Sequence, residues 1–245
     1  MNRFYKLKRI DNNKFKVTIK KEFFHDVVLS FDETGKAYEF ASAMVNDGEH
    51  RKTRSGGQAS RNKKEIFANT FEGKLAELGF YSYCVDNGVD ISEPDFSVSG
   101  LGIWDSYDFK YKEKYIAIKS TARYSQLLLL EIKDWNANGQ YIPNIDNGKT
   151  AEYDYIVLCR VNPIVKGIVD KAKDAKDIKE IEYEVEITGY ITHEDLKYII
   201  NNNYVLEQNS YLNKTKMDAS NYYVQANDLR EPEELIKKLS KTDKE

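Results

Sequence analysis

The feature that most constrains the fold is a run of seven residues near the middle of the chain, Tyr155 to Val161, in which only Arg160 is charged. Such a run suits a central strand that is covered on both faces, because a half-exposed strand alternates apolar and polar residues. Shorter strand-like runs alternate with helix-like stretches from residue 65 onward. This alternation predicts an α/β or α+β core.

Charge and pattern divide the chain into three predicted parts. Residues 1–49 contain alternating stretches and a turn signal, which indicate a small β-rich unit that could contact DNA. Residues 50–64 contain many cations and no acid, and residues 65–245 carry the core and a C-terminal extension. The middle part is either a solvated linker or a loop that grips phosphates, because glycines let a backbone approach a ligand and cations neutralise phosphates. In the second interpretation its DNA-binding residues are Arg51, Lys52, Arg54, Gly56, Gly57 and Arg61.

Local patterns predict the elements of the core. Glu65 to Leu78 has helical apolar spacing, and Gly79 stands where a C-cap glycine is expected. A capping-box pattern, Thr192 to Asp195, predicts a helix through Ile200, and a last helix is expected from Pro232 to Leu239. Short strands are expected at 81–85, 96–98, 106–111, 115–120 and 127–132, with an edge-like strand at 183–187.

Composition excludes several classes of protein. Apolar residues make up 41% and charged residues 31%, which is enough for a sizeable core and too apolar for a disordered chain. No apolar run approaches the roughly 20 residues that cross a bilayer, so no membrane is expected. Two cysteines make neither a disulfide framework nor a zinc cluster, so a cytoplasmic location with reduced thiols is expected. The net charge is −3, so any DNA-binding surface must be local.

The residues that carry chemistry are predicted in a hairpin. Two β-rich runs, 106–111 and 115–121, are separated by three charged residues. Asp108 should therefore face Lys119 across the pair, within one residue. Period-two geometry puts Ala117 and Lys119 on one face of their strand. Asp108, Ala117 and Lys119 should converge on one small patch.

This patch resembles the active site of the PD-(D/E)xK nuclease superfamily, which includes many restriction endonucleases. In that family an acid on one strand is followed by acid-x-lysine on the next. Asp108 matches the first acid and Lys119 matches the lysine. The resemblance covers about residues 65–161 and implies a restriction-endonuclease-like core, in which helices flank a mixed central sheet.

The resemblance also implies roles for the residues of the site. Asp108 and the backbone carbonyl of Ile118 would be metal ligands, and Lys119 would orient the nucleophile. Glu77, on the preceding helix, would be an accessory acid and ligand. Asp95, which follows Pro94, is an alternative first acid, and Glu72 is an alternative to Glu77.

Position 117 departs from the family pattern, because it is alanine where Asp or Glu is expected. We favour replacement of a catalytic acid to abolish cleavage, since the surrounding pattern is intact and alanine is the usual choice for truncating a side chain. A second interpretation is that the chain is a natural inactive relative. In a third interpretation another acid has taken over the role, with Glu131 or Glu113 as candidates.

The predicted function is that of a sequence-specific double-stranded DNA endonuclease of the type II restriction type, impaired by Ala117. It would hydrolyse phosphodiester bonds with Mg²⁺, or with Mn²⁺ as a substitute, because hard cations bind carboxylates and activate water. Arg123 and Gln126, just after the second hairpin strand, would add DNA contacts. A palindromic target would favour a homodimer. The alternatives are a catalytically dead DNA-binding protein of the nuclease fold, a nuclease acting on another nucleic acid, and an α/β protein that is not a nuclease.

Overall fold

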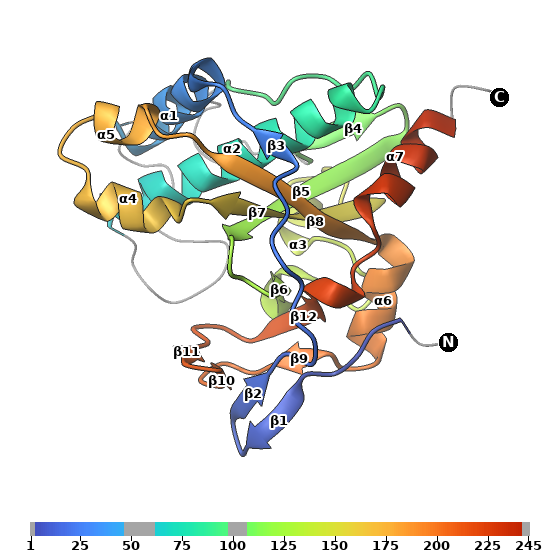
Figure 1. The fold of residues 1–245 in the computed structure, drawn as a ribbon. Helices are drawn as coiled ribbons and strands as arrows, with labels where there is room; N and C mark the ends of the chain where they lie inside the picture. The colour runs from blue at the N-terminus through green and yellow to red at the C-terminus, as the bar shows by residue number, and fades with distance from the viewer. Residues whose placement is uncertain (1–2, 47–61, 98–106, 242–245) are drawn as a thin grey trace.

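A computed structural model describes residues 3–46, 62–97 and 107–241 of the chain (Figure 1). The helices are α1 (Phe31–Asn46), α2 (Lys63–Asp86), α3 (Ile142–Asp146), α4 (Val165–Lys171), α5 (Lys176–Lys179), α6 (His193–Asn201) and α7 (Pro232–Lys241), with 3₁₀ turns η1 (Ile132–Asp134) and η2 (Ala226–Asp228). The strands are β1 (Lys8–Asp11), β2 (Lys14–Lys16), β3 (Val27–Val28), β4 (Phe109–Tyr111), β5 (Lys114–Ala122), β6 (Leu127–Glu131), β7 (Tyr155–Asn162), β8 (Glu184–Thr192), β9 (Val205–Leu206), β10 (Tyr211–Leu212), β11 (Thr215–Lys216) and β12 (Asn221–Gln225).

The core is a mixed five-stranded sheet in the order β3-β8-β7-β5-β4. Only β5 and β7 are parallel, and the other neighbours are antiparallel. The apolar run from Tyr155 forms the middle strand, β7, and its interior residues are buried on both faces. Val157 packs into one apolar cluster and Leu158 into the other, on the opposite face. The predicted α/β class with a doubly covered central strand is therefore confirmed.

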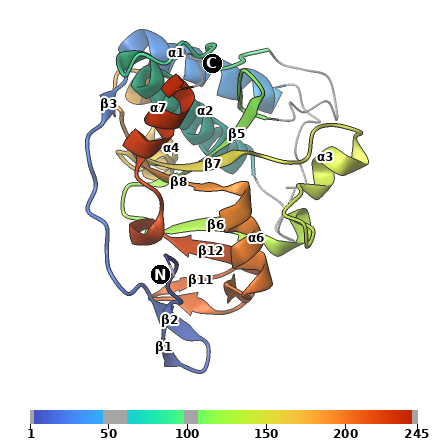
Figure 2. The same cartoon turned by 90° about the vertical axis from the view of Figure 1, so that its right-hand side faces the viewer.

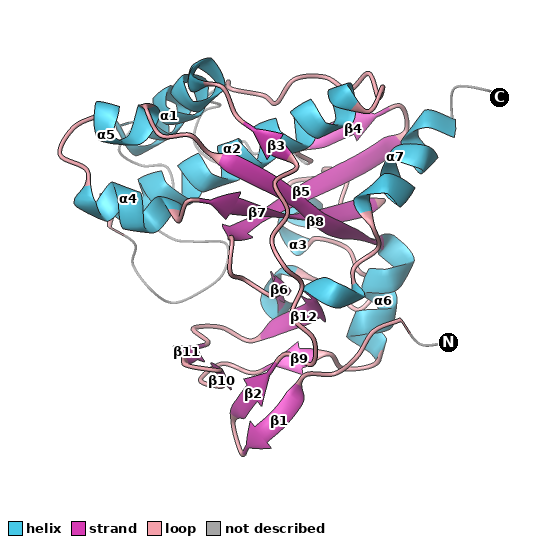
Figure 3. Ribbon diagram, in the orientation of Figure 1, coloured by secondary structure: helices cyan, strands magenta, loops and turns pink. Residues whose placement is uncertain are grey.

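Helices cover one face of this sheet, and a second sheet covers the other (Figures 2 and 3). In Figure 2, α1, α2 and α7 lie above the five-stranded sheet. Below it come a three-stranded sheet, β6-β12-β9, and then a four-stranded sheet, β1-β2-β10-β11. No helix within the described ranges is long and apolar enough to cross a membrane.

Helix α2 is longer than the sequence pattern predicts. Gly79 is not a C-cap: it lies within the helix, where a Cβ would sit only 2.5 Å from Cγ1 of Val185 on β8. The glycine is therefore a close-packing position, which lets the helix approach the sheet. Residues 81–85, expected as a strand, form the last turns of the same helix. Residues 96 and 97 form no strand.

The N-terminal segment contributes to two different sheets. Strand β2 pairs with β10, and β3 pairs with β8. Residues 31–46, expected within a β-rich unit, form α1 instead. The reason is a capping box that the pattern analysis missed, in which Ser30 N donates to Glu33 at 2.8 Å and Glu33 N donates to Ser30 Oγ at 3.3 Å.

Two further sequence predictions have different outcomes. The capping box that opens α6 is present, with Thr192 and Asp195 bonding each other's backbone. Strand β8, expected at an edge, lies between β3 and β7. Its alternation is misleading because Glu186 is not solvated: it is buried and paired with Arg160 of β7.

Candidate active site at the β4–β5 hairpin

The predicted hairpin is present, but its register differs by two residues from the predicted one, in which Asp108 faces Lys119. Phe109 pairs with Ile116, and Asp108 N donates to the Ile116 carbonyl at 3.1 Å. Asp108 itself precedes β4 and is not part of the paired register. A register extended by one residue would put Asp108 opposite Ala117, two residues before Lys119 on the same face of β5.

The Asp108 carboxylate continues the hydrogen bonding to β5 just before β4 begins. Its Oδ2 accepts a hydrogen bond from Ile118 N at 2.6 Å, in place of the backbone carbonyl that a longer strand would supply. The N–H and C=O of a strand residue point to the same side, so the Ile118 carbonyl also faces Asp108. Asp108 and the backbone of Ile118, which carry two of the predicted metal-binding oxygens, are therefore in direct contact.

A polar cavity of about 600 Å³ opens beside Asp108. It brings together carboxylates from three places in the sequence: Glu77 of α2, Asp95 of the following segment and Asp108 of the hairpin. The remaining lining residues are Lys74, Ser92, Glu93, Tyr107, Phe109, Lys110, Gly148, Lys149 and Thr150. Both first-acid candidates and the predicted accessory acid thus share one cavity.

Lys74, which the sequence analysis missed, organises one wall of this cavity. Its buried Nζ donates to Glu77 Oε2 at 2.5 Å and to the Asp95 carbonyl at 2.6 Å. The ammonium also lies 4.7 Å from the ring centroid of Phe40 and 5.5 Å from that of Phe96, within cation–π range. Lys74 therefore fixes the Glu77 carboxylate and ties the Asp95 segment to α2.

Asp95 itself shapes a turn. Its Oδ1 accepts from Ser97 N at 2.7 Å and its Oδ2 from Ser97 Oγ at 2.9 Å. These bonds are typical of a turn-forming aspartate. Of the two candidates for the first acid, Asp108 is the one on the hairpin beside position 117.

Ala117 and Lys119 face the layer beneath the five-stranded sheet. Ala117 is only 2% exposed and belongs to the apolar cluster that includes Leu128 and Leu158. The Lys119 Nζ lies 6.0 Å from the ring centroid of Tyr141, just before α3. Neither residue lines the polar cavity.

The alternative acids lie elsewhere. Glu72 faces Ser120, on the helix-covered side of β5 and opposite to Lys119. Burial raises the pKa of Glu72 from 4.5 to about 7, against the lowering effect of its hydrogen bond with Ser120. Glu131 belongs to β6 and lines a different cavity, and Glu113 is at the exposed hairpin turn. Neither Glu72 nor Glu131 lines the cavity beside Asp108.

The predicted DNA-binding residues are placed in part. Gln126 is engaged by the backbone of Lys21, accepting from its N–H at 2.8 Å and donating to its carbonyl at 3.1 Å. These bonds occupy both ends of the amide in a structural role. Arg123 is exposed and donates to Asn162 Oδ1 at 3.0 Å. The six residues predicted in the basic loop, Arg51, Lys52, Arg54, Gly56, Gly57 and Arg61, lie outside the described residues.

The oxygen donors fall short of a complete Mg²⁺ site. In the described ranges no group of three or more His, Cys, Asp or Glu side chains is placed to hold a metal ion. Asp108 and the Ile118 carbonyl have the chemistry that Mg²⁺ prefers, but the residue beside Asp108 is alanine. The residues present therefore do not fit a resident divalent ion.

Comparisons with family models, curated proteins and solved structures found no match for this chain.

Proposed function

We propose that this chain is a DNA endonuclease of the restriction type whose metal-binding centre is disabled at Ala117. It would bind double-stranded DNA and cleave it slowly or not at all. The observation that carries the proposal is the hydrogen bond from Ile118 N to the Asp108 carboxylate, because Ile118 lies between Ala117 and Lys119 on β5. The family pattern requires Asp108, Ala117 and Lys119 to converge.

The surroundings of the hairpin support the proposal. Glu77 comes from the helix that precedes the hairpin and lines the same cavity as Asp108. The next strand of the same sheet, β7, runs parallel to β5. A mixed sheet with a helix packed behind the hairpin is the arrangement expected of the restriction-endonuclease-like core.

Phosphodiester hydrolysis needs opposite charge near the scissile phosphate. In this chain the Lys119 ammonium would orient the attacking water and offset negative charge. Asp108 would be a ligand of the divalent ion. A divalent ion, once its missing ligand is supplied, would polarise the phosphate. Lys74 would keep the Glu77 carboxylate at the cavity wall, at 2.5 Å from its own Nζ.

A naturally inactive DNA-binding protein of the same fold is the second candidate. The burial of Ala117 among apolar side chains favours it, since a chain adapted to alanine would pack that position tightly. The two candidates differ in one respect: a recently disabled centre regains activity when the acid returns, whereas a long-abandoned one does not.

The test is to restore the acid. We expect Ala117→Glu or Ala117→Asp to cleave a long natural DNA in Mg²⁺ at least about 100-fold faster than the unchanged chain, because a ligand that stabilises transition-state charge is regained. Gel electrophoresis after timed incubation measures the rate. Discrete bands would indicate sequence-specific cleavage, and a smear would indicate a nuclease without strict sequence choice.

Two controls make this test specific. Asp108→Asn added to the restored variant should remove the regained cleavage, and EDTA should do the same. Circular dichroism would show whether each variant is folded, because position 117 is buried. If both restored variants are folded and remain inert, position 117 is not the missing ligand and the nuclease proposal fails.

A further inference from the structure

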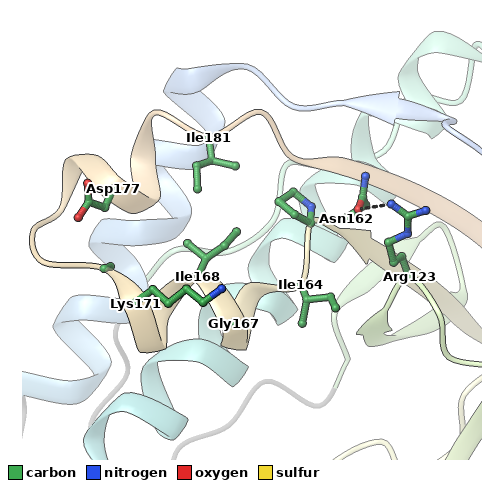
Figure 4. Close-up of a pocket in the computed structure, with 10 residues that line it drawn as sticks. Arg123, Asn162, Ile164, Gly167, Ile168, Lys171, Asp177 and Ile181 are labelled. Atoms are coloured by element: carbon green, nitrogen blue, oxygen red, sulfur yellow. Dashed lines mark hydrogen bonds between the residues drawn. The ribbon is translucent and has the colours of Figure 1, made fainter.

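A second cavity, of about 570 Å³, lies at the other end of β5 (Figure 4). Arg123 directly follows β5, and Asn162 ends the parallel neighbour β7. Crevices at the carboxyl ends of parallel strands are the usual ligand sites of α/β sheets. Six residues separate Arg123 from Ala117, roughly 20 Å along the strand, so this cavity is distinct from the candidate active site.

The wall of this cavity is mainly apolar. Ile164, Ile168 and Ile181 supply the large side chains, with Pro163 and Ala172 beside them. Gly167 of α4 adds space, because a Cβ built there would meet nothing within 4 Å. The volume and the apolar lining are those of a small-molecule site, which ordinarily measures about 300–1,000 Å³.

The charges of the cavity are separated. Arg123 lies at one end, held by its bond to Asn162 Oδ1 at 3.0 Å and by the Phe23 ring at 5.7 Å (Figure 4). Lys171 lies between the ends, and Asp177 lies at the far end, where its Oδ2 accepts from Lys173 N at 2.8 Å. A guanidinium has five N–H donors, and the bond to Asn162 uses one of its nitrogens. The end near Arg123 therefore favours an anionic group.

We propose that this cavity binds a small amphipathic anion. The apolar body of the ligand would lie on the isoleucines and Gly167, and its carboxylate, sulfonate or phosphate group would bind Arg123. This inference is independent of the proposed metal-binding centre, since Asp108, Ala117 and Lys119 do not line this cavity.

The test uses two fluorescent probes of similar shape. Anilinonaphthalene sulfonate carries an anionic group, and N-phenyl-1-naphthylamine lacks it. We expect both to bind the unchanged, full-length protein, with the anionic probe bound more tightly and at one site per chain. Arg123→Met should weaken the anionic probe about tenfold, the effect of one charge-assisted hydrogen bond, and leave the neutral probe within about twofold.

A steric variant tests the location. Gly167→Leu should fill the cavity and weaken both probes by at least about tenfold, while the helix is retained because leucine has a higher helix propensity than glycine. Gly35→Leu is the matched control: Gly35 is a helical glycine whose added Cβ also meets nothing within 4 Å, and it does not line this cavity. It should leave both affinities unchanged.

Four outcomes would overturn the proposal. The first is the absence of binding by the unchanged protein, and the second is binding that Gly167→Leu leaves intact. The third is an equal loss of both probes in Arg123→Met, which would indicate an apolar groove without anion recognition. The fourth is displacement of the anionic probe by a short DNA duplex, which would assign Arg123 to nucleic-acid backbone contact instead.

Discussion

Two ion pairs of the molecule, Arg160 with Glu186 and Lys74 with Glu77, differ in what surrounds them. Arg160 and Glu186 are 0% and 1% exposed and pair across β7 and β8. The other guanidinium bonds of Arg160 go to the carbonyls of Lys21, Glu22 and Ser125. Lys74 and Glu77 also pair, but they line an open cavity of about 600 Å³.

The difference indicates a structural role for the Arg160 pair and a candidate functional role for the Lys74 pair. Glu186 accepts further bonds from Phe24 N at 3.2 Å and Thr188 Oγ1 at 2.8 Å, so the Arg160 network is closed and pins residues 21–24 across the sheet. A fully satisfied buried network specifies one structure. The pair at the cavity wall faces space that a ligand can enter, which is the usual setting of a binding site.

Removing the cation from each pair gives the largest expected contrast in stability. Arg160→Met should lower the free energy of unfolding by about 3–5 kcal/mol, because Glu186 is left as a buried, uncompensated charge. Lys74→Met should lower it by about 1–2 kcal/mol, since the methionine keeps its apolar contacts with the rings and water can reach Glu77. Urea unfolding at pH 7 measures both changes. Lys179→Met, which removes the exposed pair of Lys179 with Glu39, is the control and should lower the free energy of unfolding by under about 1 kcal/mol. Equal losses in Arg160→Met and Lys74→Met would remove the distinction between the two regions.

Glu72, on the helix that joins the two regions, should make stability depend on pH. Its pKa rises from 4.5 to about 7 on folding, so the folded state holds a proton that the unfolded state has lost. The contribution of Glu72 to stability is therefore largest below about pH 4.5 and falls, by up to about 2–3 kcal/mol, as pH rises to about 7.

The variant Glu72→Gln should remove this part of the pH dependence. The amide stays neutral at every pH and can still bond Ser120, so the protein should gain stability at pH 8 and little at pH 4.5. Glu113→Gln, at the exposed hairpin turn, is the control and should leave the profile unchanged. Parallel profiles for Glu72→Gln and the unchanged protein, from urea titrations between pH 4 and pH 8, would contradict the assignment.

Two glycines of α2 test how tightly each side of that helix is packed. Gly79→Ala should destabilise the protein by about 1–3 kcal/mol, because the new methyl group would overlap Val185. Gly73→Ala should stabilise it by up to about 1 kcal/mol, since a Cβ at Gly73 meets nothing within 4 Å and alanine favours the helix. Thermal melts measure the change in melting temperature of each variant. The two changes should have opposite signs, and changes of the same sign would show that the helix is not close-packed against the sheet at Gly79.

The elements that the sequence predicts well are those whose burial leaves a simple pattern. Strand β7 is apolar throughout because both of its faces are covered, and the box at Thr192 opens α6 as expected. The capping box of Ser30 and Glu33 was equally visible in the sequence, but the strand-like residues before it drew the prediction towards β structure. Gly79 shows that a helical glycine marks either an end or a close approach, and the pattern alone does not distinguish them.

The candidate site could be predicted only in part. The hairpin follows from local spacing, but its register was wrong by two residues, because Phe109 pairs with Ile116 and the prediction, in which Asp108 faces Lys119, would pair it with Ile118. The role of Lys74 could not be predicted, because its partners Phe40 and Phe96 come from segments on either side of it in the sequence. Likewise, the alternation around Glu186 suggests an exposed face, and only its pairing with Arg160 explains its burial.

We propose that the Asp108 carboxylate and the Ile118 carbonyl are two ligands of a divalent-cation site in which the carboxylate at position 117 is missing. The most direct test is the affinity for Mn²⁺, measured by isothermal titration calorimetry on the unchanged protein, on Ala117→Asp and on Ala117→Asp with Asp108→Asn. We expect Ala117→Asp to bind one Mn²⁺ at least about tenfold more tightly than the unchanged protein does, and the metal to raise its melting temperature. The added Asp108→Asn should abolish both effects. Equal Mn²⁺ affinity in all three folded proteins would contradict it.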